Sequence, residues 1–458
     1  MTIINRSLFI LGLGISGMSL AKKLNFRNIY CWDDNSEIRG LAKKQQINIK
    51  EPNLKNLRHT DFLVLSSGMN HESKSPHNSV VIAKSLKIPI ISDIELIHLL
   101  GLKNYLIGIT GTNGKSSTTK FITDSLCHKN FLKAQACGNI GIPFTELKIK
   151  KDSVLVIECS SFQLSKINNL RFDIAILLNI SSDHIDWHMS LKNYINSKEK
   201  VFKNQTLSDH AIICIDDKNC NNVANQFKKK YKSKLIKISV KKKLNDGIFL
   251  EESYNYITIF NSINSKSIKI NKKSISLALT KANLQNILAT YTVNFILKQN
   301  INLFVESLKN IEVLEHRMEY IGKYKNICFY NDSKSTNVNS SISAIESYEN
   351  IFWILGGRKK VGGLSGIEKN LNNILKSFAY GESGEEFKEF LIKCGINSIY
   401  KESLEEIIFK AVELALQENQ KINVIFSPCA SSFDQFKNFE DRGDFFKKTV
   451  KKSVKIEK

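Results

Sequence analysis

The segment GTNGKSS at residues 111–117 contains the residue types best suited to chemistry in this sequence. Its glycines allow a tight turn that aims several backbone N–H groups at one point. Lys115 adds a mobile cation, and Ser116 adds a hydroxyl that can bind Mg²⁺. Phosphate oxygens bind to such an array at the start of a helix, where the helix dipole is positive. The sequence therefore predicts a nucleoside-triphosphate site.

The neighbouring residues place this site between a strand and a helix. The apolar residues 106–110 predict a strand, and a helix is expected from Lys115 onward. The strict phosphate-loop pattern has a glycine five residues before Gly114, where this chain has Ile109. Only the second half of the motif is matched, and a glycine-rich turn without a ligand is the alternative. The predicted nucleotide contacts are Gly111, Thr112, Asn113, Gly114, Lys115, Ser116 and Ser117.

Two further predicted strands end in polar side chains. Residues 154–157 lead into Glu158, and residues 174–178 lead into a segment that contains His184. The carboxyl ends of parallel strands meet at one edge of a sheet, so Glu158 and His184 are expected on the same edge as Lys115. A carboxylate there can hold Mg²⁺ against phosphates. A structural histidine is the alternative for His184, but its aspartate neighbours favour a functional role.

The N-terminal segment has a second glycine loop. Residues 12–17 read GLGISG after a predicted strand at 8–11, and a strand at 28–32 ends in Asp33 and Asp34. This spacing is the dinucleotide-binding fingerprint. By itself the pattern suggests NAD. A glycine loop at a helix N-terminus also serves any diphosphate, including that of a UDP-sugar, so the residues leave both possibilities open.

The C-terminal segment repeats the arrangement of strands that lead into polar loops. Strands predicted at 327–330, 351–355 and 423–426 are followed by NDSKSTN, GGRKK and SPCASSFD. Ser432 with Gln435 three residues later reads as a capping box, which would make Ser432 a helix N-cap. A capped helix end leaves N–H groups that can bind a carboxylate. We therefore expect an anionic substrate group here.

The chain of 458 residues is long enough for two to four domains. Alternating strands and helices predict an α/β fold with parallel sheets and right-handed crossovers. We expect domains at residues 1–93, 94–313 and 314–458. Short strands between 210 and 275 precede a helix in which Asn286 is read as structural. The apolar positions of that helix are Leu277, Leu284, Ile287, Leu288 and Tyr291.

The composition limits the class of protein. The formal charge of +22 is concentrated in lysine runs at 228–243 and 447–458, which fit a solvated surface better than a nucleic-acid or membrane partner. The 9 cysteines are scattered without a C-x-x-C pair, which favours a reducing cytoplasm over a zinc site or disulfides. No apolar run is long enough for a membrane span, and the N-terminus lacks the features of a signal peptide.

Taken together, these residues favour an ATP-dependent ligase that acts on an anionic substrate. Hydrolysis alone would not need so many polar loops in the last segment. A ligase would phosphorylate a carboxylate to an acyl phosphate, which an amine then attacks. Such a reaction needs cations at the position where negative charge develops on the transferred phosphoryl group. It also needs an active site that excludes water, which would hydrolyse the acyl phosphate.

Six segments in the same order resemble the Mur ligase family: GTNGKSS, ECSSFQL (158–164), LLNISSDHID (177–186), EHRME (315–319), NDSKSTN (331–337) and SPCASSFDQFKNFEDRG (427–443). GLGISG and residues 138–141 extend the resemblance, which covers the whole chain. It is closest to members that add D-glutamate, since the D-N-P-R motif of the diaminopimelate-adding members is absent. The resemblance implies a Rossmann-like N-terminal domain, a central P-loop ATPase-like domain and a Rossmann-like C-terminal domain.

The resemblance also implies the reaction. D-glutamate would be joined to UDP-N-acetylmuramoyl-L-alanine at the expense of ATP, in the cytoplasmic stage of peptidoglycan synthesis, by a monomer that binds no nucleic acid and no membrane. Two Mg²⁺ ions would be held by Ser116, Glu158, His184 and Lys198, and Lys198 would react with CO₂ to form a carbamate. A buried lysine loses its proton readily, which suits this reaction. The catalytic residues would be Lys115, Glu158, His184 and Lys198.

The remaining implied contacts fall into three sets. The UDP-sugar, rather than NAD, would contact Gly14, Ser16, Asp34, Asn35, Gly68 and Asn139. ATP would also contact Asn283, Arg317 and Asp332. D-glutamate would contact Lys334, Thr336, Lys360, Ser432 and Phe439.

Some positions depart from the family pattern. Ala282 stands where a histidine is common, Lys359 competes with Lys360 for the substrate, and no basic residue is seen near Asp34 and Asn35. A folate polyglutamate-adding ligase is an alternative, but it does not usually have an N-terminal UDP-binding unit. A basic P-loop ATPase acting on nucleic acid is a second alternative, which would need aromatic residues among the lysines.

Overall fold

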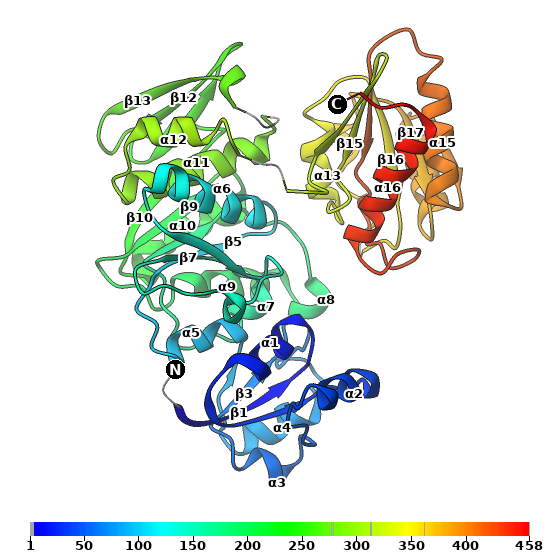
Figure 1. Cartoon of the computed structure of the whole chain (residues 1–458). Coiled ribbons are helices and arrows are strands. Elements are labelled where there is room, and N and C mark those ends of the chain that lie inside the picture. The colour runs from blue at the N-terminus through cyan, green and yellow to red at the C-terminus, as the bar shows by residue number, and fades with distance from the viewer. Residues whose placement is uncertain (1–3, 276, 278, 312–313, 361, 458) are drawn as a thin grey trace. The chain divides into compact units, whose positions relative to one another are not determined.

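The computed structural model describes residues 4–275, 277, 279–311, 314–360 and 362–457. The chain divides into two compact units: Met1–Ser274 with Gln285–Lys309, and Ile275–Leu284 with Asn310–Lys458. Both combine helices with largely parallel sheets, which confirms the predicted α/β class. The three sheets lie within residues 4–91, 105–271 and 319–426 (Figure 1). The domain boundaries at residues 93 and 313 stay a prediction.

The first sheet is fully parallel, with strand order β2-β1-β3-β4. Its strands are apolar at successive positions because both faces are buried. Leu8 and Ile10 belong to one buried cluster, whereas Phe9 and Leu11 belong to another. The strands are β1 (Ile4–Leu11), β2 (Phe26–Trp32), β3 (Phe62–Leu65) and β4 (Ile90–Ile91), and the helices are α1 (Ile15–Lys23), α2 (Ser36–Lys44), α3 (Leu54–Leu57) and α4 (Asn78–Ser85).

The second sheet has nine strands in the order β13-β12-β11-β10-β9-β8-β5-β7-β6. The strands from β6 to β11 in this order are parallel, and β11, β12 and β13 pair antiparallel. The strands are β5 (Tyr105–Thr110), β6 (Ala134–Gly138), β7 (Val154–Glu158), β8 (Ile174–Leu177), β9 (His210–Cys214), β10 (Lys234–Ser239), β11 (Ile248–Glu252), β12 (Tyr256–Asn261) and β13 (Lys266–Asn271). Strand β5 therefore lies between β7, which ends at Glu158, and β8, which leads into the segment with His184.

Helices and 3-10 turns connect these strands. One prediction needs correction: the helix expected to include Leu277 begins at Lys281. Thr280 caps it, since its hydroxyl accepts a hydrogen bond from the Asn283 N–H at 3.1 Å. The helices are α5 (Leu96–Leu99), α6 (Lys115–Cys127), α7 (Ser161–Leu164), α8 (Ile185–His188), α9 (Leu191–Glu199), α10 (Lys218–Lys230), α11 (Lys281–Ile296) and α12 (Ile301–Ser307). No helix in the described part of the chain is long and apolar enough to cross a membrane.

The third sheet has the order β14-β15-β19-β16-β17-β18, and β14 is its one antiparallel strand. Helices α15 and α16 supply buried residues to one core cluster, and α13 and α14 supply another (Figure 1). The strands are β14 (Glu319–Tyr324), β15 (Ile327–Asn331), β16 (Ile351–Gly356), β17 (Ile374–Tyr380), β18 (Ser398–Lys401) and β19 (Ile422–Phe426), and the helices are α13 (Val338–Ile345), α14 (Gly384–Lys393), α15 (Leu404–Ala415) and α16 (Phe439–Ser453).

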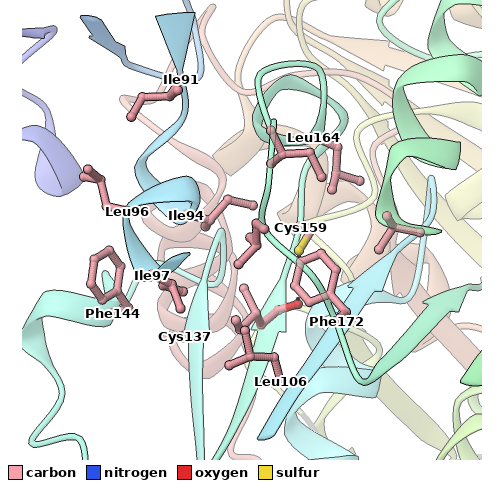
Figure 2. Packing of buried hydrophobic residues seen from close by; sticks show 14 of the residues in the cluster. Ile91, Ile94, Leu96, Ile97, Leu106, Cys137, Phe144, Cys159, Leu164 and Phe172 are labelled. Carbon is pink, nitrogen blue, oxygen red and sulfur yellow. Dashed lines mark hydrogen bonds between the residues drawn. The ribbon is translucent and has the colours of Figure 1, made fainter. Parts of the chain in front are cut away.

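A short linker joins the first sheet to the second. Its apolar side chains, among them Ile94 and Ile97, belong to the same buried cluster as Cys137 of the central sheet (Figure 2). Within the linker, Glu95 is only 1% exposed, and its carboxylate accepts hydrogen bonds from three successive backbone N–H groups, those of residues 168–170. The linker is therefore fixed by both apolar packing and a buried carboxylate.

Replacing Glu95 by Ala leaves these three buried N–H groups without their acceptor. We expect a loss of at least about 2 kcal/mol, because buried donors that lose a charged partner are costly. Calorimetry should show a thermal midpoint lower by several degrees. The exposed Glu389 provides a matched control, and Glu389→Ala should leave the midpoint within about one degree. Equal midpoints for Glu95→Ala and wild type would contradict this account of the linker.

Candidate active site

The phosphate loop lies between β5 and α6, as the sequence predicts. Gly114 has φ +84°, a conformation that favours glycine, and it immediately precedes the helix. The Lys115 ammonium folds back onto the loop and donates hydrogen bonds to the carbonyls of Gly111 at 3.0 Å and Thr112 at 2.8 Å. Its side chain thus lies over the turn where phosphate oxygens would bind.

The segment after β8 forms hydrogen bonds with the other side of the phosphate loop. Asn179 accepts the Thr112 N–H on its carbonyl and the Asn113 N–H on Oδ1, both at 2.8 Å. Asn286 Oδ1 accepts the Thr118 hydroxyl at 2.9 Å, which agrees with the structural role predicted for Asn286. These contacts hold the loop in one conformation before any ligand binds, which reduces the entropy lost on binding.

Glu158 is the last residue of β7, and β7 pairs with β5 so that Ile109 lies opposite Glu158. Its side chain is 2% exposed, and Oε1 accepts a hydrogen bond from Asn139 Nδ2 at 3.0 Å. Among the described residues, Oε2 has no hydrogen-bond partner. A buried carboxylate oxygen without a donor is costly unless a cation or another ligand completes it.

These groups fit Mg²⁺ bound together with phosphate. No group of three or more His, Cys, Asp or Glu side chains in the described residues could hold a metal by itself. Mg²⁺ is commonly bound by one or two carboxylates, waters and substrate phosphates. The unpartnered Oε2 of Glu158 and the Ser116 hydroxyl, which is in the first turn of α6, are suited to that mode.

Lys198, near the end of α9, is 1% exposed. Its Nζ donates a hydrogen bond to the Gly111 carbonyl at 2.6 Å and lies 4.6 Å from the centre of the Tyr194 ring. Burial, together with repulsion from Lys115, holds the pKa of Lys198 well below its ordinary value, although Asp183 acts in the opposite direction. A lowered pKa makes the neutral amine more accessible than in an exposed lysine, and this is the form that can attack CO₂.

His184 precedes α8 with φ 53°, in the left-handed region. Its Nε2 lies 3.6 Å from Asp183 Oδ2, and its ring meets the Phe162 ring at 4.8 Å. The strand pairings place β5 beside both β7 and β8, so the segments with Lys115, Glu158 and His184 follow neighbouring strands. The sheet order therefore confirms the predicted shared edge.

His188 was not predicted to have a role, but it is one of the buried polar residues of this region. Its Nε2 lies 2.9 Å from Ser161 Oγ, and it stacks on Phe162 at 5.7 Å. Burial and the nearby Lys198 lower the pKa of His188 to about 4, so the imidazole is neutral near pH 7. A lone histidine four residues after His184 carries no sequence signal that separates a structural role from a catalytic one.

The N-terminal glycine loop has the geometry that its sequence predicts. Gly12 has φ +95°, and a Cβ on Gly17 would lie 2.0 Å from the Gly12 carbonyl oxygen. Gly14 has no atom within 4 Å of such a Cβ, so the space in front of it is open. Ser16 is in the first turn of α1. This open helix end suits a diphosphate.

Two basic residues lie close to the end of β2, a feature that was not predicted from the sequence. Asp33 Oδ2 accepts the Leu13 N–H at 2.7 Å and ties β2 to the glycine loop. Arg39, which is on α2, stacks over Trp32 at 4.3 Å, and His77 lies 3.4 Å from Asp34. Basic groups are thus present near Asp34. His77 was missed because it is distant in sequence from the strand end, whereas Arg39 follows Asp34 by a few residues and could have been recognised from the sequence. Asn35 caps α2 through the Glu37 N–H.

Gly68 follows β3 in the first unit, and the remaining predicted residues belong to the second unit. Asn283 lies in the first turn of α11. Asp332 follows β15 and is 5% exposed; its carboxylate accepts hydrogen bonds from Ser335 Oγ and from Ser427 Oγ. Burial raises the pKa of Asp332 to about 6, although Arg317 is among the groups that oppose this shift.

Lys334 and Phe439, both predicted to contact the amino acid, lie together, with Nζ 4.7 Å from the ring centre. Thr336 follows in the same loop, which ends at the N-cap of α13. A backbone bridge between Arg358 and Ser431 joins the loops that contain Lys360 and Ser432. Ser432 is buried, at 2% exposure.

One prediction here is wrong, because Ser432 does not cap a helix. Residues 432–435 form a single turn, and α16 begins at Phe439 with Asn438 as its N-cap. The Gln435 side chain bonds instead to the Leu404 N–H at 3.3 Å and to the Glu402 carbonyl at 2.7 Å. A capping box needs this side chain to turn back on its own helix, and these contacts outside the segment prevent it. Of the neighbouring cations, Lys359 is paired with Glu386.

Comparison with known proteins agrees with this geometry. A family model described as the Mur ligase middle domain matches residues 109–294. The UDP-N-acetylmuramoylalanine–D-glutamate ligase of Rickettsia felis is 35% identical over 452 residues, covering 97% of this chain and 96% of that protein. The chain belongs to the Mur ligase family. Within it, the D-glutamate ligase of Wolbachia pipientis is also similar, at 34% identity over 96% of both chains.

Two solved ligase structures have a fold similar to that of this chain. The crystal structure of MurF ligase from Thermotoga maritima in complex with ADP aligns with a TM-score of 0.61 at 16% identity, covering 99% of this chain and 96% of that one. The MurC ligase of the same organism aligns with a TM-score of 0.60 at 16% identity, covering 98% and 100%. The predicted family architecture is therefore confirmed along nearly the whole chain.

The buried Asp332 predicts a pH dependence of stability. Because its folded pKa of about 6 lies above its ordinary value of 3.8, the native state holds this proton more tightly than the unfolded state. Its stabilising contribution is complete below the ordinary value and is lost as the pH rises through about 6. Asp332→Asn should therefore gain stability relative to wild type between roughly pH 4 and 7, measured by calorimetry. A difference that stays constant over this range would contradict the assignment.

Proposed function

We propose that this chain is an ATP-dependent ligase that joins D-glutamate to UDP-N-acetylmuramoyl-L-alanine. The observation that carries the proposal is a single sheet edge that combines a phosphate loop, the unpartnered Oε2 of Glu158 and the buried amine of Lys198. These groups suit the transfer of a phosphoryl group. The substrates are assigned from the relatives, whose full-length match includes D-glutamate ligases at 35% identity.

The proposed reaction has two steps. A carboxylate oxygen of the nucleotide sugar attacks the γ-phosphorus of ATP, the bond to the bridging oxygen breaks, and ADP leaves. The D-glutamate amine then attacks the carbonyl carbon of the acyl phosphate, loses a proton and expels inorganic phosphate. Both steps need fixed positions for the reacting atoms more than they need acid–base chemistry.

The residues of the first unit would serve the first step. Lys115 would exchange its bonds to the loop carbonyls for bonds to the β- and γ-phosphates. We propose that Ser116 and Glu158 hold one Mg²⁺ and that His184 and Lys198 contribute to a second. When bound, Mg²⁺ supplies positive charge that neutralises the phosphate oxygens.

Lys198 would contribute as a carbamate. The neutral amine attacks CO₂, a nitrogen–carbon bond forms and a proton leaves, so a buried base becomes an anionic oxygen ligand. The remaining N–H can still donate to the Gly111 carbonyl, which Lys198 contacts at 2.6 Å. The low pKa of Lys198 and its nearly complete burial support this proposal.

Residues of the second unit would bind the amino acid. Lys334, Lys360 and the backbone around Ser432 are proposed to bind the two carboxylates of D-glutamate, with Phe439 and Thr336 beside them. Lys334 is already held against the Phe439 ring at 4.7 Å. Asn283, Arg317 and Asp332 are proposed ATP contacts. Gly14, Ser16, Asp34, Asn35, Gly68 and Asn139 are proposed contacts of the nucleotide sugar.

The substrate assignment has a direct test. Purified protein should release phosphate from ATP only when UDP-N-acetylmuramoyl-L-alanine and D-glutamate are both present, measured by a coupled phosphate assay. Omitting either one, or replacing D-glutamate by L-glutamate, should return the rate to background. Turnover with a folate substrate, or with single-stranded nucleic acid in place of both, would contradict the proposal.

The carbamate proposal predicts the behaviour of a lysine variant. Lys198→Ala should lower turnover by roughly 10²- to 10³-fold, because an anionic ligand at the phosphates is lost. Added acetate or propionate should restore part of the rate by supplying the missing carboxylate. Lys192, exposed on the same helix, gives a matched control, and Lys192→Ala should retain the wild-type rate. A Lys198→Ala rate equal to wild type would refute the proposal.

A further inference from the structure

Three hydrogen bonds join the loop after β3 to the central sheet's polar segments. Trp187 Nε1 donates to the Gly68 carbonyl at 3.4 Å, and Lys166 Nζ donates to the Met69 carbonyl at 3.4 Å. In the opposite direction, Asn70 Nδ2 donates to the Trp187 carbonyl. We call these five residues, Gly68, Met69, Asn70, Lys166 and Trp187, the loop latch.

A lysine is unusual at the buried position of Lys166. Its side chain is 2% exposed, its Nζ lies 5.5 Å from the centre of the Trp187 ring, and within the described residues it forms no ion pair. Burial lowers the pKa of Lys166 to about 8, opposed by the charges of Asp93 and Glu72. Burying an ammonium without a carboxylate partner is costly, and packing alone would be served better by an apolar side chain.

The indole of Trp187 is held by aromatic packing. Its ring packs against Phe162 at 4.8 Å and against His188 at 4.5 Å. The far end of the loop is fixed separately, because Lys84 of α4 donates to the His71 carbonyl at 2.8 Å. The loop is thus anchored at one end to α4 and at the other end to α8.

The latch connects two sets of proposed site residues. Gly68 is a proposed contact of the nucleotide sugar, and Trp187 is on the same one-turn helix that His184 begins, where the His188 N–H donates to the His184 carbonyl at 3.0 Å. A shift of the loop away from α8 would change the distance between these sets. Displacements of this kind lower rates strongly in reactions that depend on positioning.

We propose that Lys166 and Trp187 are positioning residues that hold the loop at residues 68–70 against α8, so that the nucleotide sugar is presented to the phosphate site at a fixed distance. This inference rests on the proposed function for its substrate. Neither side chain needs to touch the reacting atoms. The hydrogen bonds donated by Trp187 Nε1 and Lys166 Nζ are both long, at 3.4 Å, and individually weak, so the effect comes from the set.

Two conservative variants test the latch. Trp187→Phe keeps the aromatic packing and removes the N–H donor, and Lys166→Met keeps the length of the side chain and removes the ammonium. Each should raise KM for UDP-N-acetylmuramoyl-L-alanine roughly 3- to 10-fold, the range expected for one lost hydrogen bond, while KM for ATP and D-glutamate stays within about 2-fold. The double variant should fall short of the product of the two effects, because both act on one loop.

Hydrogen exchange supplies a measurement that needs no turnover. In both variants the amides of residues 68–72 should exchange at least about 10-fold faster than in wild type. Trp353→Phe serves as the control for loss of an indole hydrogen bond, because Trp353 Nε1 donates to the Ser427 carbonyl at 2.8 Å in the second unit. It should leave both the exchange of residues 68–72 and the KM for the nucleotide sugar unchanged.

The outcomes are distinguishable. Unchanged exchange in both variants would overturn the latch itself. Faster exchange with an unchanged KM for the nucleotide sugar, or an equal rise in all three KM values, would overturn its positioning role. Failure of the wild-type protein to use these substrates would reject the proposed function instead, and the exchange measurement would still decide whether the latch holds the loop.

Discussion

The Gly111 carbonyl oxygen accepts hydrogen bonds from two lysines, Lys198 at 2.6 Å and Lys115 at 3.0 Å, and the proposed chemistry depends on this arrangement. Two ammonium groups on one buried acceptor repel each other, and desolvation adds to the cost. This conflict lowers the pKa of the more deeply buried Lys198, and loss of its proton would relieve the repulsion. Lys115 then remains the mobile cation that phosphates can draw away from the loop.

The rest of the central sheet maintains this arrangement. Strand β5 lies between β7 and β8, so the phosphate loop is bordered by Glu158 and by the Asn179 segment. A Cβ on Gly108 would lie 2.6 Å from the Phe172 ring, which shows how closely β5 is packed below the loop. The buried linker at Glu95 and the loop latch extend the same rigid framework to the N-terminal sheet. Rigid placement of this kind is what phosphoryl transfer requires of a protein.

Local sequence patterns were sufficient for the elements around the phosphate loop. A strand, a glycine turn and a helix are encoded by adjacent residues, so β5, α6 and the shared edge with Glu158 could be predicted. Predictions failed where a side chain had a distant partner. The Gln435 side chain bonds to the backbone of Glu402 and Leu404, so Ser432 does not cap a helix. His77, Lys166 and Trp187 were missed because their partners come from other segments.

The central claim is that the buried Lys198 amine becomes a carbamate, and ¹³C NMR tests it most directly. Protein equilibrated with ¹³CO₂ should show one carbamate signal, separate from bicarbonate, that is absent from a Lys198→Met variant. Removing CO₂ should abolish the signal and the ligase activity together. An active wild-type enzyme without this signal, or a signal that survives in Lys198→Met, would contradict the account.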